Sequence, residues 1–454
     1  MRVLYSCLIR IAAPFAFAVV LWRGMRDRSY WQGLRERFGF GAMLPAPAIW
    51  LHAVSLGEMT AAAPLLRALS ARHPQMPLVV TTATPAGRAR ALALFGDRAD
   101  VRFLPYDTPG SVRRFLVRIR PCVAIIMETE LWPNLYHQCA KRGVPVFLAS
   151  ARLSARSVAR YRRLGGLFGG VFTDNVLIAA QSADDAERFK AIGASPARTK
   201  VVGNVKFDLE VDPGVVAAGE AIRHAFGDLR PVWIAGSTHA GEEEQLLDAH
   251  AELLARRPNA LLLLVPRHKD RFADVADLLA RRGVKFARRS EMARGGGPAR
   301  EDGMARGDGP ARGVDDAPVL LVDTVGELAA LYASADVAFV GGSLVAVGGH
   351  NMLEPAALRL PVLTGPHHFN AKEIAQLLLE RGAAVQVADA QELAAVLMRL
   401  LDDPAERRRI GDLGLKIVEA NRGSVARLLE LIEPALPGAR QSAAEAAVYP
   451  SAAR

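Results

Sequence analysis

The stretch that decides the fold is Val337-Ala338-Phe339-Val340-Gly341-Gly342-Ser343-Leu344-Val345-Ala346-Val347-Gly348-Gly349-His350-Asn351-Met352-Leu353-Glu354-Pro355. Four apolar residues suited to a buried strand run directly into glycines, and open α/β sheets bind ligands where strands end in this way. The second glycine pair lets the backbone approach a ligand, and a helix starting near Asn351 would offer free N–H groups to an anion. The stretch predicts a ligand site. An ordinary strand-to-helix turn is the alternative.

A second stretch near the N-terminus has the same organisation. The apolar run Ala48-Ile49-Trp50-Leu51 stops in His52-Ala53-Val54-Ser55-Leu56-Gly57-Glu58. A carboxylate is therefore expected at the carboxyl edge of a sheet, at the turn between a strand and a helix. The two stretches together predict two ligand-facing sheet edges, one in each half of the chain.

Strand-like and helix-like segments alternate along the whole chain, which indicates parallel sheets built from βα repeats. The layout predicts an α/β fold of two Rossmann-like domains with a ligand cleft between them, meeting near residues 206–231. The expected strands of the first half are Ala48–Ser55, Pro77–Thr82, Val123–Met127, Pro145–Ser150 and Val176–Ala180. Those of the second half are Val232–Ala235, Ala260–Val265, Val319–Val322, Val337–Val340 and Pro361–Leu363.

Composition narrows the class of protein. The chain has 454 residues, of which 51% are hydrophobic and 23% charged, so it is too apolar to be disordered and long enough for two domains. Its net charge of +10 favours an anionic membrane face or a phosphorylated substrate as a partner, and no basic-aromatic motif for nucleic acid occurs. The three cysteines have no metal-type spacing, so neither a disulfide framework nor a zinc site is expected.

The N-terminus carries one membrane signal. Residues 3–22 are apolar apart from Arg10 and a few small polar groups, and several arginines follow them. Pro14 would kink a helix here, and no small-residue cleavage site precedes the basic stretch. We expect residues 1–28 to form an uncleaved membrane anchor helix with the main body on the cytoplasmic side. A helix that merely packs on the first domain is the alternative.

Two further segments are expected to be disordered. The string Met292-Ala293-Arg294-Gly295-Gly296-Gly297-Pro298-Ala299-Arg300 recurs, nearly unchanged, as residues 304–312, and it has no apolar face. We therefore expect a surface insertion over about 288–316. The tail, residues 437–454, is rich in Ala, Ser and Arg and is expected to be poorly ordered as well.

Two carboxylates are candidates for acid–base chemistry. Glu58 lies between a strand and a helix whose first turn is expected to hold Pro64, so its carboxylate would be fixed at the sheet edge. Glu130 follows the strand that ends at Met127, where Pro133 prevents the strand from continuing. Glu58 would act as a general base, and Glu130 would orient or tune it. Helix capping is the alternative for either residue.

The second half carries four short polar strings that each follow a strand. Hydroxyls and amides near Ser237 suit phosphate, and the guanidinium of Arg267 is permanently charged and bidentate. No P-loop and no aspartate pair for Mg²⁺ occurs, which argues against a metal-dependent transferase. Together these strings predict a nucleotide site without metal. The candidate residues are Ser237, Thr238, Arg267, His268, Gly326, Glu327, Asn351 and Glu354.

The motifs also occur in the order seen in a known family. They are Ser55-Leu56-Gly57-Glu58, Thr129-Glu130-Leu131-Trp132-Pro133-Asn134, Ala151-Arg152-Leu153-Ser154, Gly203-Asn204-Val205-Lys206-Phe207-Asp208, Gly236-Ser237-Thr238-His239, Pro266-Arg267-His268 and the stretch from Gly341 to Pro355. From about residue 2 to 430 the chain closely resembles the 3-deoxy-D-manno-octulosonic acid (Kdo) transferases. The resemblance implies a GT-B glycosyltransferase at the cytoplasmic face of a Gram-negative inner membrane. It also implies inverting transfer of Kdo from CMP-Kdo to a lipid A precursor, lipid IVA, with no metal and no cofactor.

The resemblance also implies roles for single residues. Glu58 matches the family's catalytic base and Glu130 a second essential carboxylate, while Arg267, Gly326, Glu327, Asn351 and Glu354 match its CMP-binding residues. Ser55, Arg152 and Lys206 are the acceptor-side candidates. Residues 29–215 would then form the acceptor-binding domain and residues 216–436 the CMP-sugar-binding domain. Leu56 and Val325 depart from the family's commoner Val and Met, which puts only side-chain fit near the nucleotide in question.

Two other classes of protein fit parts of the sequence. One is another GT-B enzyme, a UDP-sugar transferase or a sugar-nucleotide epimerase, which a preference for UDP over CMP would favour. The other is a non-catalytic, membrane-tethered nucleotide-binding protein. Such a protein usually lacks the base, whereas Glu58 and Glu130 are both present.

Overall fold

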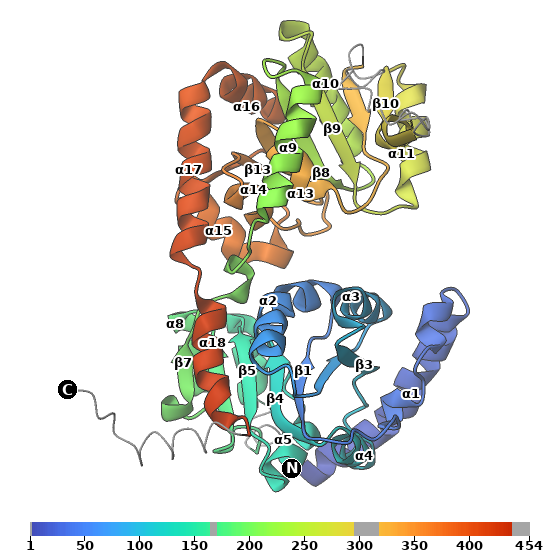
Figure 1. Ribbon diagram of the computed structural model, residues 1–454, viewed down its shortest axis with the longest axis vertical. Coiled ribbons are helices and arrows are strands. Elements are labelled where there is room, and N and C mark those ends of the chain that lie inside the picture. Colours follow the sequence, from blue (N-terminus) through green and yellow to red (C-terminus); the bar gives the residue numbers. More distant parts are fainter. Residues whose placement is uncertain (1, 164–169, 295–316, 438–454) are drawn as a thin grey trace, which may run out of the picture. The chain divides into compact units, whose positions relative to one another are not determined.

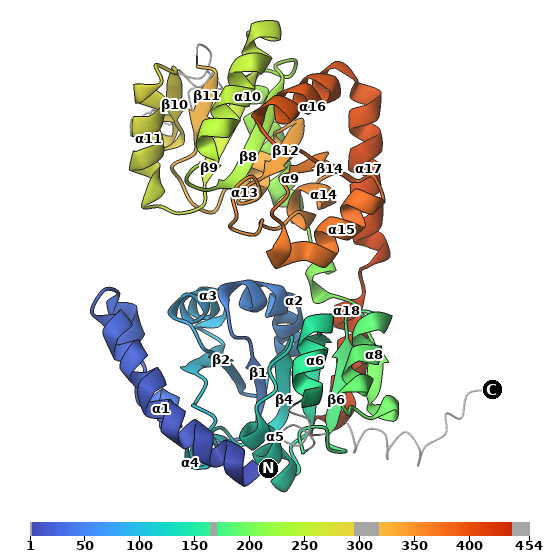
Figure 2. The same ribbon diagram turned by 180° about the vertical axis from the view of Figure 1, so that it is seen from behind.

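The computed structural model describes residues 2–163, 170–294 and 317–437. Within these ranges the chain forms two compact units, shown from opposite sides in Figure 1 and Figure 2. The first unit comprises the described residues among Met1–Asp208 and Asn421–Arg454, and the second comprises those among Leu209–Ala420. Most of the repeated insertion and the whole tail beyond residue 437 lie outside the described residues.

The first unit is built on a parallel sheet of seven strands in the order β3-β2-β1-β4-β5-β6-β7. Its central strands are buried along nearly their whole length because both faces of the sheet are covered. Along β1, Ile49 and Leu51 enter one core while Ala48 and Trp50 enter the other. The strands are β1 (Ala48–His52), β2 (Leu78–Thr82), β3 (Ala99–Phe103), β4 (Pro121–Met127), β5 (Val146–Ala151), β6 (Val176–Ala180) and β7 (Thr199–Val201).

Helices connect these strands and cover both faces of the sheet (Figure 1). The helix that follows β1 begins at Leu56, directly after the N-cap residue Ser55, so Pro64 lies inside it and not in its first turn as expected from sequence. The hydrogen bonds of Ser55 at the helix start set this earlier beginning. The helices are α2 (Leu56–Arg72), α3 (Pro85–Phe95), α4 (Pro109–Ile119), α5 (Pro133–Lys141), α6 (Ala155–Arg163), α8 (Ala183–Ala191) and α18 (Ser424–Ile432).

The second unit repeats the plan with a parallel sheet in the order β10-β11-β9-β8-β12-β13-β14. Its buried side chains again divide between two cores, with Trp233 on one face of β8 and Ile234 on the other. The strands are β8 (Val232–Thr238), β9 (Leu261–Pro266), β10 (Phe286–Arg288), β11 (Val319–Leu321), β12 (Val337–Val340), β13 (Val362–Thr364) and β14 (Ala384–Gln386).

The helices of the second unit lie on both faces of its sheet (Figure 2). They are α9 (Pro213–Phe226), α10 (Glu243–Arg256), α11 (Arg271–Arg281), α12 (Arg289–Arg294), α13 (Leu328–Ala333), α14 (Leu353–Ala357), α15 (Lys372–Glu380), α16 (Ala390–Asp402) and α17 (Pro404–Ala420). The expected start of the disordered insertion, at about residue 288, is wrong because α12 is helical through Arg294. Its preceding strand and an ion pair between Arg289 and Glu327 hold this segment to the unit.

The expectation of an α/β fold with two Rossmann-like sheets is confirmed. The compact units, however, divide differently from the expected domains at the C-terminal end. Helix α18, expected in the second domain, belongs to the first unit. The Asp208 carboxylate accepts hydrogen bonds from the backbone N–H groups of Gly423 (2.5 Å) and Val425 (2.6 Å), which fastens the start of α18 there.

Helix α1 (Arg2–Gly24) is the one helix of the described residues that is long and apolar enough to cross a membrane, a test that a signal sequence or a core helix could also pass. Only 6% of its most apolar window is buried, so α1 is not a core helix. It touches the first unit along one side, where Ser6 Oγ lies 2.9 Å from Asn134 Oδ1 and Phe17 packs edge-on against Phe38. The helix passes through Pro14 without interruption.

Candidate functional site

Glu58 lies in the first turn of α2, and hydrogen bonds with Val54 and Ser55, just before the helix, hold its side chain in place. Ser55 Oγ accepts from the Glu58 N–H (3.3 Å) and donates to Glu58 Oε1 (3.2 Å), while the Val54 N–H donates to Glu58 Oε2 (2.8 Å). The residue therefore does cap the helix, which was the alternative reading of the sequence. Each carboxylate oxygen still has acceptor capacity toward a ligand, so capping and acid–base chemistry are compatible.

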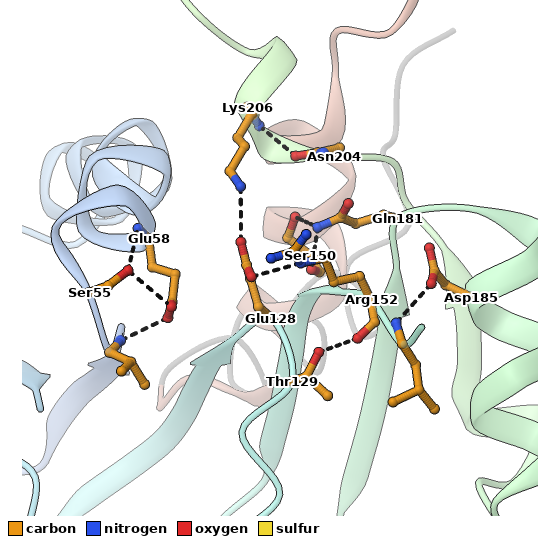
Figure 3. Close-up of polar contacts among 12 residues, drawn as sticks. Ser55, Glu58, Glu128, Thr129, Ser150, Arg152, Gln181, Asp185, Asn204 and Lys206 are labelled. Carbon is orange, nitrogen blue, oxygen red and sulfur yellow. Dashed lines mark hydrogen bonds and ion pairs between the residues drawn. The ribbon is translucent and has the colours of Figure 1, made fainter. Parts of the chain in front are cut away.

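Glu128 is a further carboxylate at this edge, and it was not selected from the sequence. It follows β4 directly and adopts a positive φ of 55°, unusual for a residue with a side chain. Figure 3 shows its carboxylate between two cations, with Arg152 Nε 2.8 Å from Oε2 and Lys206 Nζ 3.0 Å from Oε1. Burial alone would raise the pKa of Glu128, but Lys206 and Arg152 hold it below its ordinary value. Two of the acceptor-side candidates, Arg152 and Lys206, thus bind the same carboxylate.

Glu130 lies close to Glu58 and is the most strongly perturbed of the three carboxylates. Burial, together with the nearby charge of Glu58, raises its pKa to about 7, although the Trp132 indole N–H donates to it at 2.8 Å. Burial also raises the pKa of Glu58, with a smaller contribution from Glu128 and an opposing one from Lys206. The charge of Glu58 acts on Glu130, which places the two carboxylates within electrostatic reach of each other. The pair is poised to hold a proton near neutral pH.

In the second unit a buried carboxylate organises the glycine-rich stretch after β12. Glu242, which is fully buried, accepts hydrogen bonds from the N–H groups of Gly342 (2.7 Å), Ser343 (3.0 Å) and Leu344 (2.9 Å). Burial raises the pKa of Glu242, and these amides oppose that effect. Gly342 has a φ of 71°, which glycine adopts without strain. The loop is therefore shaped from inside by a residue one hundred positions earlier.

Ser237 and Thr238 form the last two residues of β8, which extends further than the sequence predicted. Ser237 has a φ of 62° and is almost fully buried. The Thr238 hydroxyl donates to Glu243 Oε1 at 3.1 Å, and Glu243 in turn pairs with Arg271 at 3.0 Å. The Thr238 hydroxyl is thus engaged within the unit, and the strained backbone at Ser237 marks the edge of the strand.

Arg267 and three histidines gather at the ends of β8, β9 and β12. His239 Nε2 lies 2.8 Å from His350 Nε2, with the rings stacked, and His268 packs edge-on against His239 at 5.6 Å. Burial, followed by the Arg267 charge, lowers the pKa of His350 to about 4, so its ring is neutral at pH 7. Arg267 itself is exposed. His239 and His350 were not selected from the sequence, although both stand inside quoted motifs.

The remaining second-unit candidates divide into two local pairs. Gly326 has a φ of 97°, and Glu327 next to it binds Arg289 at 2.7 Å. Asn351 donates through Nδ2 to Glu354 Oε1 at 3.0 Å. Asn351 Oδ1 also accepts from the Leu353 N–H at 3.1 Å, so the short helix α14 begins close to where it was expected.

These side chains are not arranged as a metal centre. Within residues 2–163, 170–294 and 317–437, no group of three or more His, Cys, Asp or Glu side chains is placed to hold a metal ion. The chemistry that the described geometry supports is carboxylate acid–base chemistry at the edge of the first unit. At the edge of the second unit it is recognition by Arg267, neutral imidazoles and a shaped backbone loop.

Comparisons with known proteins agree on one family. Residues 32–209 match the family profile of 3-deoxy-D-manno-octulosonic-acid transferase (kdotransferase), and residues 318–416 match that of glycosyl transferases group 1. A 3-deoxy-D-manno-octulosonic acid transferase of Haemophilus influenzae is 40% identical over 96% of this chain and 99% of its own. One from Bordetella pertussis is 37% identical over 95% and 99%. A putative UDP-N-acetylglucosamine 2-epimerase of Listeria monocytogenes shares the fold, with a TM-score of 0.54 at 15% identity over 86% of this chain and 96% of its own.

Proposed function

Because this chain belongs to the 3-deoxy-D-manno-octulosonic acid (Kdo) transferase family of glycosyltransferases, we propose that it moves Kdo from CMP-Kdo to a lipid A precursor, lipid IVA. The reaction would invert the anomeric centre and need no metal. The observation that carries the proposal is the pair of perturbed carboxylates, Glu58 and Glu130, at the carboxyl edge of the first sheet.

Glu58 would act as the general base. A sugar hydroxyl is a weak nucleophile, so its proton must leave as its oxygen bonds to the anomeric carbon of Kdo. The raised pKa of Glu58 makes it a better proton acceptor than an ordinary carboxylate, and its capping contacts hold the side chain in one orientation. Both properties support the assignment.

Glu130 would tune that base. Its pKa of about 7 means that it carries a proton for much of the time at neutral pH, which relieves the repulsion that a second full charge would exert on Glu58. Glu128 would contribute differently, because Arg152 and Lys206 keep it ionised. We therefore propose Glu130 as the titrating partner of Glu58 and Glu128 as the anchor that positions Arg152 and Lys206.

The edge of the second unit would hold the donor. As the bond between the anomeric carbon and the phosphate oxygen breaks, the electron pair leaves with CMP, and Arg267 would stabilise the resulting charge. Neutral histidines such as His350 can donate or accept single hydrogen bonds without adding charge. The proposed CMP-Kdo-binding residues are Ser237, Thr238, Arg267, His268, Gly326, Glu327, Asn351 and Glu354.

The acceptor side would lie on the first unit. Ser55, Arg152 and Lys206 surround the carboxylates and are the proposed acceptor-side residues. We propose that α1 anchors the protein at the cytoplasmic face of the inner membrane, since its apolar surface is almost entirely uncovered. Removing residues 1–28 should abolish membrane partitioning and leave CMP binding intact.

The direct test is product analysis. Purified protein is incubated with CMP-Kdo and lipid IVA, and the lipid product is weighed by mass spectrometry. A mass increase of one or more Kdo units supports the proposal. Parallel incubations with UDP-sugars test the rival GT-B activities, and Glu58→Gln serves as the matched control for chemistry. Transfer from a UDP-sugar without transfer from CMP-Kdo would contradict the proposal.

A further inference from the structure

We propose that α6 binds the phosphate groups of the acceptor lipid through a row of three arginines, Arg156, Arg160 and Arg163. This inference rests on the proposed function, which supplies a phosphorylated acceptor, and it assigns the acceptor's anionic end to a particular surface of the first unit. The three residues are spaced by four and three positions, so they share one face of the helix.

The charge of α6 is not explained by partners within the protein. The helix has the sequence ARSVARYRR, with four arginines and no acidic residue. Arg156, Arg160 and Arg163 are all exposed. Among the residues that the structure describes, none of the three takes part in an ion pair, whereas nearby Arg152 binds Glu128 and Arg188 on the neighbouring helix α8 binds Asp184 and Asp185.

Helix stability does not explain the arrangement either. Like charges three or four positions apart destabilise a helix. Arginines in the last turn interact favourably with the helix dipole, but Arg156 lies in the first turn, where a cation is unfavourable. The three arginines therefore destabilise α6, and a bound anion would reduce the repulsion between them.

Helix α6 also lies near Glu130, the second candidate carboxylate, whose charge acts on Tyr161. Val158 and Tyr161, on the apolar side of α6, pack against a hydrophobic core of the first unit. The Arg160 guanidinium lies 5.7 Å from the centre of the Tyr161 ring. Burial raises the pKa of Tyr161, with a further contribution from the charge of Glu130. Helix α6 begins directly after the Arg152 motif, and in Figure 2 it lies beside α8, which it contacts. An acceptor bound beside Glu130 would thus lie next to α6.

Arginine suits this ligand better than lysine would. Its planar guanidinium binds phosphate oxygens through two parallel hydrogen bonds, and such contacts carry geometric specificity. The chemistry is shared with anionic membrane phospholipids, so the inference commits to the acceptor's own phosphates and leaves the bilayer surface as an outcome of the test.

The test compares the triple variant Arg156→Gln, Arg160→Gln, Arg163→Gln with a charge-matched control, Arg256→Gln, Arg281→Gln, Arg408→Gln. The control residues are exposed helical arginines of the second unit. Kdo transfer is measured with the bisphosphorylated lipid and with the same lipid after removal of both phosphates. We expect the α6 variant to raise the acceptor KM by about tenfold or more for the bisphosphorylated lipid only. The control should match wild type with both lipids.

Three outcomes would overturn the inference. The KM could stay unchanged, it could rise equally for both lipids, or the α6 variant could lose binding to phosphatidylglycerol vesicles without any phosphate-dependent change in KM. The last result would assign the row to the membrane surface. Thermal melting should show no loss of stability, since substitution removes repulsion. If wild type transfers no Kdo at all, the proposed function fails instead, so the two failures are distinguishable.

Discussion

The two sheet edges each place a glutamate at the same kind of turn and use it in opposite ways. Glu58, after β1, receives one backbone N–H and one hydroxyl and remains partly exposed. Glu242, after β8, is fully buried and receives the amides of the glycine-rich loop. Position in the fold therefore does not decide whether such a carboxylate is available for chemistry. The number of internal donors and the remaining exposure decide it.

The difference extends to the surroundings of each residue. Glu58 has Glu130 as a neighbour, and burial raises the pKa of both. The carboxylate of Glu242 is occupied by the N–H groups of the glycine-rich loop, so Arg267 and the three histidines are the groups proposed to bind the donor. The proposed division of roles rests on this difference, with proton transfer at the first edge and anion binding at the second.

The largest expected effect is on turnover. Glu58→Gln should lower kcat by about 10²-fold or more, because general-base catalysis contributes about 10²–10⁴-fold. Glutamine keeps an acceptor for the Val54 N–H, so the helix cap should persist. Rapid-quench kinetics at saturating CMP-Kdo measures the chemical step. A Gln variant with wild-type turnover would remove Glu58 from the role of base and direct attention to Glu130.

The second effect tests the opposite use of Glu242. Glu242→Gln should destabilise the protein by about 2–4 kcal/mol, because one amide group cannot accept from all of the loop N–H groups and each buried unpaired donor costs about 1–3 kcal/mol. Urea unfolding measures the change. Glu252→Gln, on the exposed face of α10, the helix that Glu242 directly precedes, is the matched control and should be neutral. Equal midpoints for the two variants would show that the loop does not depend on Glu242.

The third effect concerns the donor. Arg267→Ala should weaken CMP binding by about 1.5–3 kcal/mol, the range for hydrogen bonds to charged groups. Calorimetry with CMP provides the measurement, and Arg281→Ala, an exposed arginine of α11, provides the control. Unchanged affinity in Arg267→Ala would place the phosphate elsewhere on this unit.

The last effect is a pH dependence of stability that the titration of Glu130 should produce at the first edge. The pKa of Glu130 is raised from an ordinary 4.5 to about 7. The folded protein then binds a proton that the unfolded chain has released, so stability falls as pH rises from about 4.5 to 7. Glu130→Gln should remove this fall, and its stability relative to wild type should increase between pH 5 and 8. Urea midpoints across this range would show parallel curves if Glu130 does not titrate there.

The sequence predicted every central strand of both sheets and missed the four at their edges. The missed strands are β3, β7, β10 and β14, and each is a terminal strand of its sheet. Three of them have only three residues, and edge strands are less buried, so they lack the continuous apolar run that identifies a strand covered on both faces. These four strands were not predicted because they lie at the edges of the sheets.

The site was predicted in part for a similar reason. Glu58 and Glu130 were identified because they stand a few residues after apolar runs, within recognisable motifs. Glu128 has the same local signal, but its selection depends on Lys206, which lies 78 positions away. Glu242 depends on Gly342, 100 positions away. Pairings at such distances are set by the packing of the strands, and a local pattern does not contain them.

In the proposed mechanism the first edge transfers the proton and the second edge binds the donor, and one pair of measurements separates these two roles. CMP affinity by calorimetry and the single-turnover rate at saturating CMP-Kdo are determined for Glu58→Gln, for Arg267→Ala and for the double variant. We expect Glu58→Gln to slow the chemical step by about 10²-fold or more with CMP affinity unchanged, and the double variant to have the CMP affinity of Arg267→Ala alone. A large loss of CMP affinity in Glu58→Gln, with the chemical step preserved, would contradict this mechanism.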